Sequence, residues 1–268
     1  MKVKSLTLLS LVALFGLTAC GGAKFNTVDQ IKSNGTLTVG TNAEFAPFEY
    51  IENGEITGLD MDLIKAYGSY LGVKVDIQDM DFDAALLSAS KGKVDCAIAA
   101  VTKNAKREQT LSFSNAYYSS NQVVIVKDDS PYAALTTEDA ILSTLTTNKA
   151  SIGCQRGTTG QYYIEGDEDW EFDGITDSTC KTYDTGALAV KDLQNGKLDA
   201  VIIDSAPANI YVTKYEGVKV LPVVLTEEEY AIAVTKGNQT LVDSLNTFIA
   251  EAKSKGTFDE IVNKYFGE

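Results

Sequence analysis

One repeated pattern constrains the fold of this chain more than any other feature. The stretch LLSASKGKVDCAIAA (residues 86–100) is matched by VKDLQNGKLDAVIID (residues 190–204). In both copies a helical segment ends at a Gly-Lys pair, and an apolar residue, an aspartate and an apolar strand follow. Gly92 and Gly196 stand where a helix end favours a residue of left-handed conformation. The repeat therefore predicts two similarly built α/β lobes, with a single larger open sheet as the alternative.

Short apolar strands alternate with helices in the first half of the chain. Residues 36–41, 73–78 and 94–101 predict strands, and residues 59–72 and 83–93 predict the helices between them. Strands that alternate with helices of this length indicate parallel βαβ units.

Two further β-rich stretches, residues 117–126 and 225–234, lie where this pattern changes. If the chain crosses there to a second lobe and returns, the helices predicted at 241–256 and 258–266 rejoin the first lobe. A cleft between two lobes with a double hinge suits a small ligand. The acidic TEEEY (residues 226–230) is expected to face solvent beside the hinge. We expect these boundaries: lobe 1 at residues 31–119 and 230–268, and lobe 2 at residues 120–229.

The first residues, MKVKSLTLLSLVALFGLTAC, are typical of a signal peptide. Two lysines precede an apolar run that is too short to span a bilayer. The run ends in LTAC, which resembles the bacterial lipobox, in which the cysteine becomes the lipid-modified first residue. We expect a signal peptide at residues 1–19 and a lipidated tether at residues 20–30 that begins with Cys20. An ordinary cleavage site with a chance cysteine is the alternative.

Charge and composition exclude several classes of function. The formal net charge is −14, which argues against nucleic acid as a partner, because a phosphate backbone needs clustered lysine and arginine. The chain contains no histidine, so it lacks the commonest general base, the Ser-His and Cys-His pairs and most zinc sites. We expect no catalytic residue, no metal site and no cofactor.

Three cysteines remain beyond Cys20. Cys96 lies in the apolar run DCAIAAV and is expected to be a small buried residue. Cys154 and Cys180 lie at comparable places near two predicted strands. Outside the membrane a disulfide is permitted, so either these two cysteines are paired or both are free thiols.

The chain uses lysine almost everywhere and keeps arginine at two positions, Arg107 in VTKNAKRE and Arg156 in QRGTTG. Arginine adds a planar fork that grips a carboxylate with two parallel hydrogen bonds. We expect Arg107 to open a helix and to hold an anion, and Arg156 to have a structural or rim role. The alternative for Arg107 is a surface side chain paired with Glu108 or Asp81, which stabilises little.

Several runs together carry a family likeness: VGTNAEFAPFEYIENGEITGLDMDLIKAYGSYLGVKV, DFDAALLSASKGKVDCAIAAVTKNAKREQTLSFSNAYY, QRGTTG and GKLDAVIIDSAP. From about residue 31 onward the chain resembles the extracellular solute-binding proteins of family 3, the polar amino-acid receptors of ABC importers. The resemblance implies the type II periplasmic-binding-protein fold, in which two doubly wound α/β lobes are joined by a two-strand hinge. It also implies a polar α-amino acid as ligand and an ABC transporter permease as partner. With the lipobox, it implies a monomer outside the cytoplasmic membrane, lipid-anchored at the cell surface or in the periplasm.

The resemblance implies roles for residues at the carboxylate end of the ligand. Arg107 clamps the α-carboxylate, and Thr102 gives its hydroxyl and backbone N–H to the same group. Thr158 and Thr159 close over the carboxylate from the other lobe.

It implies further roles at the other end of the ligand. The carbonyl of Ala100 accepts from the α-ammonium, and Asp204 pairs with it. Phe45 covers the ligand side chain, and Phe82 forms a second apolar wall.

One departure from the family bears on specificity. Many members carry aspartate in the first loop, GTD, where this chain has Asn42. An amide exchanges only neutral hydrogen bonds, whereas a carboxylate pairs with a basic side chain. Asn42 therefore predicts a neutral polar ligand, such as glutamine or cystine, ahead of lysine, arginine or histidine. Glu44 and Gln155, the latter also assigned to the ligand, bear on this choice.

Two other functions fit the same fold. One is a sensory module that presents its ligand to a receptor kinase. The other is an enzyme similar to prephenate or arogenate dehydratases, for which Glu44 and Asp204 are the candidate acid–base residues.

Overall fold

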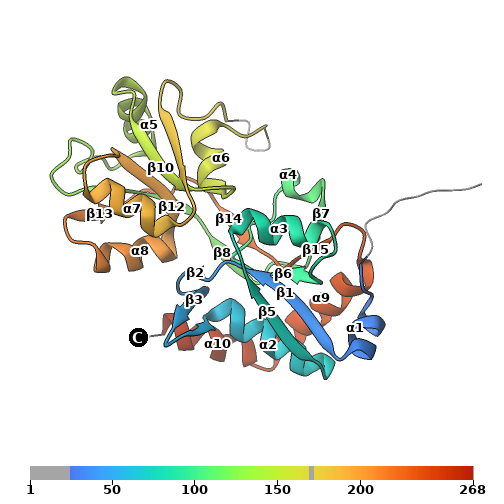
Figure 1. The fold of residues 1–268 in the computed structure, drawn as a ribbon. Coiled ribbons are helices and arrows are strands. Elements are labelled where there is room, and N and C mark those ends of the chain that lie inside the picture. The colour runs from blue at the N-terminus through green and yellow to red at the C-terminus, as the bar shows by residue number, and fades with distance from the viewer. Residues whose placement is uncertain (1–24, 169–171, 268) are drawn as a thin grey trace, which may run out of the picture.

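The computed structural model describes residues 25–168 and 172–267, which form two α/β lobes (Figure 1). The predicted signal peptide and Cys20 lie outside the described residues. Each lobe has its own five-stranded sheet, which confirms the predicted fold class and excludes a single larger sheet. Within the described part of the chain, no helix combines the length and apolar character needed to cross a membrane.

Both sheets have the same strand arrangement. In lobe 1 the order is β5-β1-β6-β15-β7, and in lobe 2 it is β11-β10-β12-β9-β13. The first three strands of each sheet are parallel, and the fourth runs antiparallel to its neighbours. The bounds in lobe 1 are β1 Thr36–Thr41, β5 Lys74–Asp79, β6 Cys96–Ala97, β7 Leu111–Phe113 and β15 Ala233–Thr235. Those in lobe 2 are β9 Gln122–Lys127, β10 Ser151–Gln155, β11 Thr179–Tyr183, β12 Ala200–Asp204 and β13 Val218–Val220.

Helices cover the sheets and bury their apolar faces. The helices of lobe 1 are α1 Val28–Asn34, α2 Leu59–Leu71, α3 Phe82–Ser90, α4 Ala105–Glu108, α9 Gln239–Ser254 and α10 Thr257–Phe266. Those of lobe 2 are α5 Glu138–Thr147, α6 Thr159–Glu165, α7 Gly186–Gln194 and α8 Ser205–Lys214. Figure 1 shows α9 and α10, drawn in red, beside the blue N-terminal part of the chain, so both ends of the described chain belong to lobe 1.

Two short antiparallel strands, β8 (Tyr118–Ser120) and β14 (Glu228–Tyr230), join the lobes, with Ser120 opposite Glu228. They lie within the two stretches predicted to cross, although the exact lobe boundaries remain a prediction. A small antiparallel sheet of three strands, β2 (Glu44–Phe45), β3 (Glu49–Glu52) and β4 (Glu55–Thr57), projects from lobe 1 toward the cleft.

The structure confirms the repeat and shortens one of its strands. Gly92 and Gly196 have φ values of 66° and 72°, so both adopt the left-handed conformation expected after α3 and α7. The strand predicted at 94–101 is reduced to Cys96–Ala97. Beyond it Ala100 has a φ of 49°, and its N–H is bonded to a side chain, the Asp60 carboxylate, rather than to a neighbouring strand.

Candidate functional site

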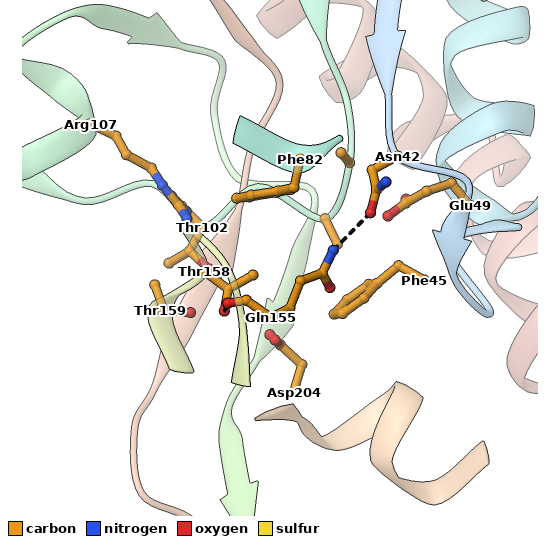
Figure 2. Close-up of a pocket in the computed structure, with 12 residues that line it drawn as sticks. Asn42, Phe45, Glu49, Phe82, Thr102, Arg107, Gln155, Thr158, Thr159 and Asp204 are labelled. Atoms are coloured by element: carbon orange, nitrogen blue, oxygen red, sulfur yellow. Dashed lines mark hydrogen bonds between the residues drawn. The ribbon is translucent and has the colours of Figure 1, made fainter. Parts of the chain in front are cut away.

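A pocket forms where the carboxyl ends of β1 and β6 in lobe 1 face those of β10 and β12 in lobe 2 (Figure 2). In open α/β sheets, ligands bind at this edge, where the strand order reverses. The space between its walls, including the part open to solvent, is about 290 Å³. The twelve lining residues are the ten predicted ligand residues, namely Asn42, Phe45, Phe82, Ala100, Thr102, Arg107, Gln155, Thr158, Thr159 and Asp204, together with Glu49 and Ala99.

Arg107 provides the only guanidinium in this pocket, and it is 5% exposed. Its Nη1 donates to the carbonyl oxygen of Thr102 at 2.6 Å, and its Nη2 donates to that of Gly157, across the cleft, at 3.0 Å. Its Nε has no hydrogen-bond partner. The fork thus lies between two backbone carbonyls that a ligand carboxylate can replace. The surface interpretation is wrong, because Arg107 is buried and Glu108 pairs instead with Lys103.

The local helix around Arg107 differs from the expectation. α4 is a single turn, and Arg107 is its third residue rather than its first. Asn104 caps this turn, since its Oδ1 accepts from the backbone N–H of Arg107 at 2.9 Å. The cap holds the backbone of Arg107, and the ring of Phe82 lies 5.2 Å from its Cζ, so both ends of the side chain are positioned.

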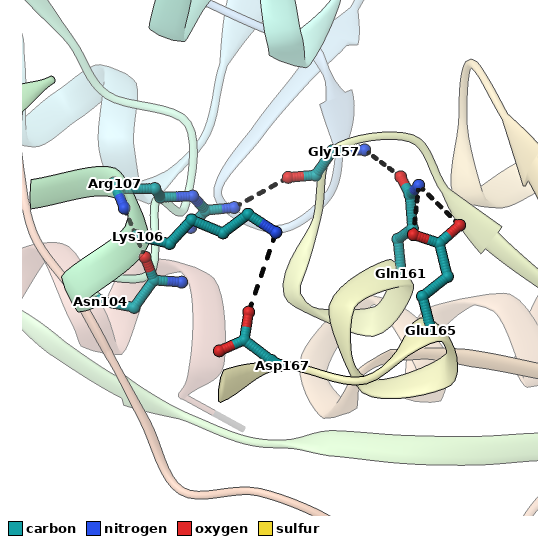
Figure 3. A network of polar contacts seen from close by, with 7 residues as sticks. All are labelled: Asn104, Lys106, Arg107, Gly157, Gln161, Glu165 and Asp167. Atoms are coloured by element: carbon teal, nitrogen blue, oxygen red, sulfur yellow. Dashed lines mark hydrogen bonds and ion pairs between the residues drawn. The ribbon is translucent and has the colours of Figure 1, made fainter. Parts of the chain in front are cut away.

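A network of polar contacts beside Arg107 also joins the lobes (Figure 3). Lys106 of α4 forms an ion pair with Asp167 at 3.9 Å. The backbone N–H of Gly157 donates to Gln161 at 2.8 Å. These contacts hold the Gly157 turn against α4 when the lobes are closed.

The threonines of the two lobes meet at a buried glutamate that the sequence analysis missed. Oε2 of Glu228 accepts from Thr102 at 2.5 Å and from Thr159 at 2.8 Å, and Oε1 accepts from Thr226 at 2.7 Å. Glu228 is 5% exposed, so the expectation that TEEEY faces solvent is wrong at this position. The side chain of Thr158 instead donates to its own turn, to the carbonyl of Gln155.

Asp204 occupies the N-cap position of α8 at the end of β12, makes no capping hydrogen bond with its side chain, and is 4% exposed. Its carboxylate accepts from the hydroxyls of Tyr230 and Ser120, and no described lysine or arginine forms an ion pair with it. Burial, and then the charge of Glu228, raise the pKa of Asp204 to about 7. A cation that enters the pocket would strongly stabilise the ionised form of this buried carboxyl.

The end of the pocket away from Arg107 contains Asn42, Gln155, Phe45 and Glu49 (Figure 2). Gln155 Nε2 donates to Asn42 Oδ1 at 2.8 Å, while Asn42 Nδ2 donates to the carbonyl of Met80 at 3.0 Å. Phe45 forms an apolar wall beside them, as expected, and is 6% exposed. Most hydrogen-bonding groups of the two amides are therefore already bonded to each other or to the protein backbone.

Glu49 is the second functional candidate that the sequence analysis missed. It is the first residue of β3 and is 1% exposed, and no N–H or hydroxyl group of the described residues donates to its Oε2. Oε1 of Gln155, on the facing lobe, is also buried without a partner. Burial, followed by the charge of Asp60, raises the pKa of Glu49 well above its usual range. The only signal in the sequence was an acid directly after the apolar stretch FAPF.

The remaining candidates lie outside the pocket. Arg156 pairs with Asp184 at 3.0 Å at the exposed rim of the cleft. Cys96 is fully buried, as predicted. Cys154 and Cys180 are free thiols whose sulfur atoms lie 3.5 Å apart, so their pairing remains a prediction. Among residues 25–168 and 172–267, no group of three or more acidic or cysteine side chains is arranged to hold a metal ion.

Comparisons with known proteins agree with this geometry. Residues 37–268 match the family described as bacterial extracellular solute-binding proteins, family 3. A probable histidine-binding protein of Neisseria gonorrhoeae is 30% identical over 94% of this chain and 91% of its own length. The arginine-binding extracellular protein ArtP of Bacillus subtilis is 27% identical over 99% of this chain and 98% of its own length. The crystal structure of a mutant of ArgBP from T. maritima aligns with a TM-score of 0.79 and 35% identity, covering 90% of this chain and 99% of that one.

Proposed function

This chain belongs to family 3 of the bacterial extracellular solute-binding proteins, and we propose that the amino acid it captures carries a positively charged side chain. Its relatives are amino-acid-binding proteins of ABC transporters, so its function is that of a solute receptor for an ABC importer. The proposal concerns the ligand and the residues that hold it.

A balance of charges in the pocket carries this proposal. The α-carboxylate of an amino acid is matched by Arg107, and its α-ammonium by Asp204. The pocket then still contains Glu49, a buried carboxyl with an unpartnered oxygen. An ionised carboxylate is stabilised in such a place only by a cation with hydrogen bonds. A guanidinium or ammonium on the ligand side chain supplies both.

The positions of these groups support an extended ligand. In Figure 2, Arg107 and Glu49 lie at opposite ends of the pocket, with Asp204 between them on the side of lobe 2. An amino acid with its carboxylate at Arg107 would direct its side chain past Phe45 toward Glu49. This proposal replaces the neutral ligand that Asn42 predicted, because Glu49 supplies the carboxylate that Asn42 lacks.

The proposal includes capture and delivery but no chemical step. The relatives reported above are binding proteins, one named for histidine and one for arginine. We propose that the mature chain works as a monomer, outside the cytoplasmic membrane, held there by a lipid on Cys20. Labelling cells with a radioactive fatty acid would test the anchor, since Cys20→Ala should remove the label.

Calorimetry tests the ligand. The protein is unfolded and refolded to remove carried-over ligand, then titrated with arginine, lysine, histidine, glutamine and citrulline. Citrulline has the shape of arginine without its charge. We expect arginine or lysine to bind at least tenfold more tightly than citrulline, and Arg107→Ala and Asp204→Ala to abolish binding. Tighter binding of glutamine or citrulline would overturn the cationic ligand, and no binding of any amino acid would overturn the site.

A further inference from the structure

A second buried carboxyl lies directly behind Glu49. Asp60, the second residue of α2, is 0% exposed and does not line the pocket. Its Oδ2 accepts from the backbone N–H of Ala100 at 2.8 Å and from the hydroxyl of Tyr117 at 2.8 Å. No N–H or hydroxyl group of the described residues donates to its Oδ1. The backbone N–H of Asp60 donates to the carbonyl of Phe48, the residue before Glu49, at 2.9 Å, so the carboxyl groups of Glu49 and Asp60 are neighbours.

Two carboxyl groups in contact require a proton between them. A carboxylate only accepts hydrogen bonds, so two ionised groups would repel each other, and a bond forms only if one of them is protonated. Glu49 Oε2 and Asp60 Oδ1 each lack a donor from any other described residue. A shared proton satisfies both sides of the contact.

The surroundings contain no charge that would remove this proton. The titratable groups facing the pair are Asp204 at the end of β12, Tyr117 before β8 and Tyr211 of α8. None of these is a cation. Among residues 25–168 and 172–267, neither Glu49 nor Asp60 forms an ion pair with lysine or arginine.

The environments of the two groups differ, and this locates the proton. Oδ2 of Asp60 accepts from the N–H of Ala100 and from the hydroxyl of Tyr117, and both donors stabilise its ionised form. No described residue donates to Oε2 of Glu49, so its ionised form has no such support. The proton therefore resides on Glu49 and is donated to Asp60.

We propose that Glu49 and Asp60 share one proton in the ligand-free receptor, and that the cationic side chain of the ligand displaces it. The inference rests on the proposed function, because it requires a cation at Glu49. The step breaks only the O–H bond of the Glu49 carboxyl. The proton leaves to the solvent buffer, and the ligand cation takes its place beside two carboxylates.

Asp60 then has a role in the cleft without touching the ligand. It accepts a hydrogen bond from the N–H of Ala100, whose positive φ turns the chain at the pocket wall. It also accepts the proton of Glu49, so that this O–H group does not face the ligand. A neutral ligand side chain contacts a protonated Glu49, which adds little to its binding free energy. A cationic side chain interacts with two carboxylates and binds more tightly. Binding of the cation is therefore coupled to pH.

The release of protons on binding can be counted by calorimetry in buffers with different ionisation enthalpies. At pH 6 to 7 we expect arginine to release about one proton more from the wild type than from Glu49→Gln. Any proton that Asp204 releases to the buffer when the α-ammonium binds is common to both proteins and cancels. Glu52→Gln, on the exposed part of the same strand, is the matched control and should release the wild-type number.

Infrared spectroscopy of the ligand-free protein keeps the test decisive if Glu49→Gln does not bind arginine. Asp204, whose pKa is about 7, contributes a protonated carboxyl band to all three proteins. We expect a second band in the wild type and in Glu52→Gln that is missing from Glu49→Gln, and arginine should remove this second band from the wild type. If arginine binds the wild type without loss of this band, the shared proton is wrong and the receptor function stands. If no amino acid binds, the proposed function itself is wrong.

Discussion

Gln155 of lobe 2 donates a hydrogen bond from Nε2 to Oδ1 of Asn42 in lobe 1, at a distance of 2.8 Å. Gln155 ends β10 and Asn42 directly follows β1, each the second strand of its sheet, so this bond joins the two sheets at the edge where the ligand site forms. It also means that protein amides are bonded to each other when the lobes are closed.

Asn42→Ala should shift the ligand-free receptor toward its open form. A buried hydrogen bond contributes about 0.5–1.5 kcal/mol, so the ratio of closed to open molecules should fall about two- to tenfold. Single-molecule energy transfer between one dye on each lobe measures this ratio, and Glu52→Gln is the control. An unchanged ratio would show that the bond adds nothing to closure.

Arg107→Lys should weaken binding even though it keeps the positive charge. Lysine cannot reproduce the planar fork that faces two carbonyls in the pocket. Losing a hydrogen bond to a charged group costs about 1.5–3 kcal/mol, which is a ten- to hundredfold rise in Kd. Arg156→Lys, at the exposed rim, should change the Kd less than twofold. Equal effects of the two substitutions would contradict the assignment of Arg107.

The stability of the ligand-free protein should fall as the pH rises. The folded pKa of Asp204, about 7, lies above the usual range of an aspartate, so this carboxyl favours the folded state when protonated. Its contribution is fully present below about pH 4 and is lost as the pH rises toward 7. Glu49 and Asp60 act in the same direction. Urea unfolding at pH 5, 6, 7 and 8 measures the trend.

Two substitutions separate Asp204 from the other groups in this experiment. Asp204→Asn should reduce the fall in the free energy of unfolding between pH 5 and pH 8 by a few kcal/mol at most. Glu228→Gln removes a charge that raises the folded pKa of Asp204, so the decline should be smaller and should end at lower pH. If neither variant changes the profile, the burial of Asp204 does not govern it.

Gly157→Ala should disfavour the closed form. Gly157 has a φ of 75°, and a Cβ there would lie 1.6 Å from Oδ1 of Asp83 on the facing lobe. The left-handed conformation itself costs a non-glycine residue about 1–2 kcal/mol. We expect at least a tenfold rise in the Kd for arginine by calorimetry.

Asp83→Ala in the Gly157→Ala background should restore part of this affinity, because it removes the clash between the lobes and leaves only the backbone strain. Asp83→Ala alone should bind like the wild type. If the double variant is as weak as Gly157→Ala, the strain in the turn accounts for the whole effect.

The sequence predicted the order of helices and strands well, because hydrophobic periodicity and the two left-handed glycines are local signals. It also led to ten of the twelve residues that line the pocket, mainly through the family resemblance. It overextended the strand at 94–101, because the hydrogen bond that draws Ala100 out of the sheet comes from Asp60, forty residues earlier in the chain.

Three buried carboxyl groups in and around the site were not predicted. Glu49, Asp60 and Glu228 lie in stretches with other acidic residues that suggest solvent-exposed positions. Their burial depends on which lobe or hinge strand packs against them, and this is a property of the assembled fold. The neutral ligand predicted from Asn42 rests on this amide alone, without the buried carboxyl of Glu49, and it stays a prediction.

The fourth strand of the lobe 1 sheet has a consequence for how the chain matures. β15 lies between β6 and β7, and it follows all of lobe 2 in the sequence. During synthesis, β7 therefore lacks its partner among the described strands until Ala233–Thr235 has been made. At that stage α9, which covers the sheet, has not yet been made either. Lobe 2 needs only one continuous segment. The lobe that leaves the ribosome first is thus the last to be completed, and a chain stalled before residue 233 would present a finished lobe 2 beside an open, aggregation-prone sheet edge.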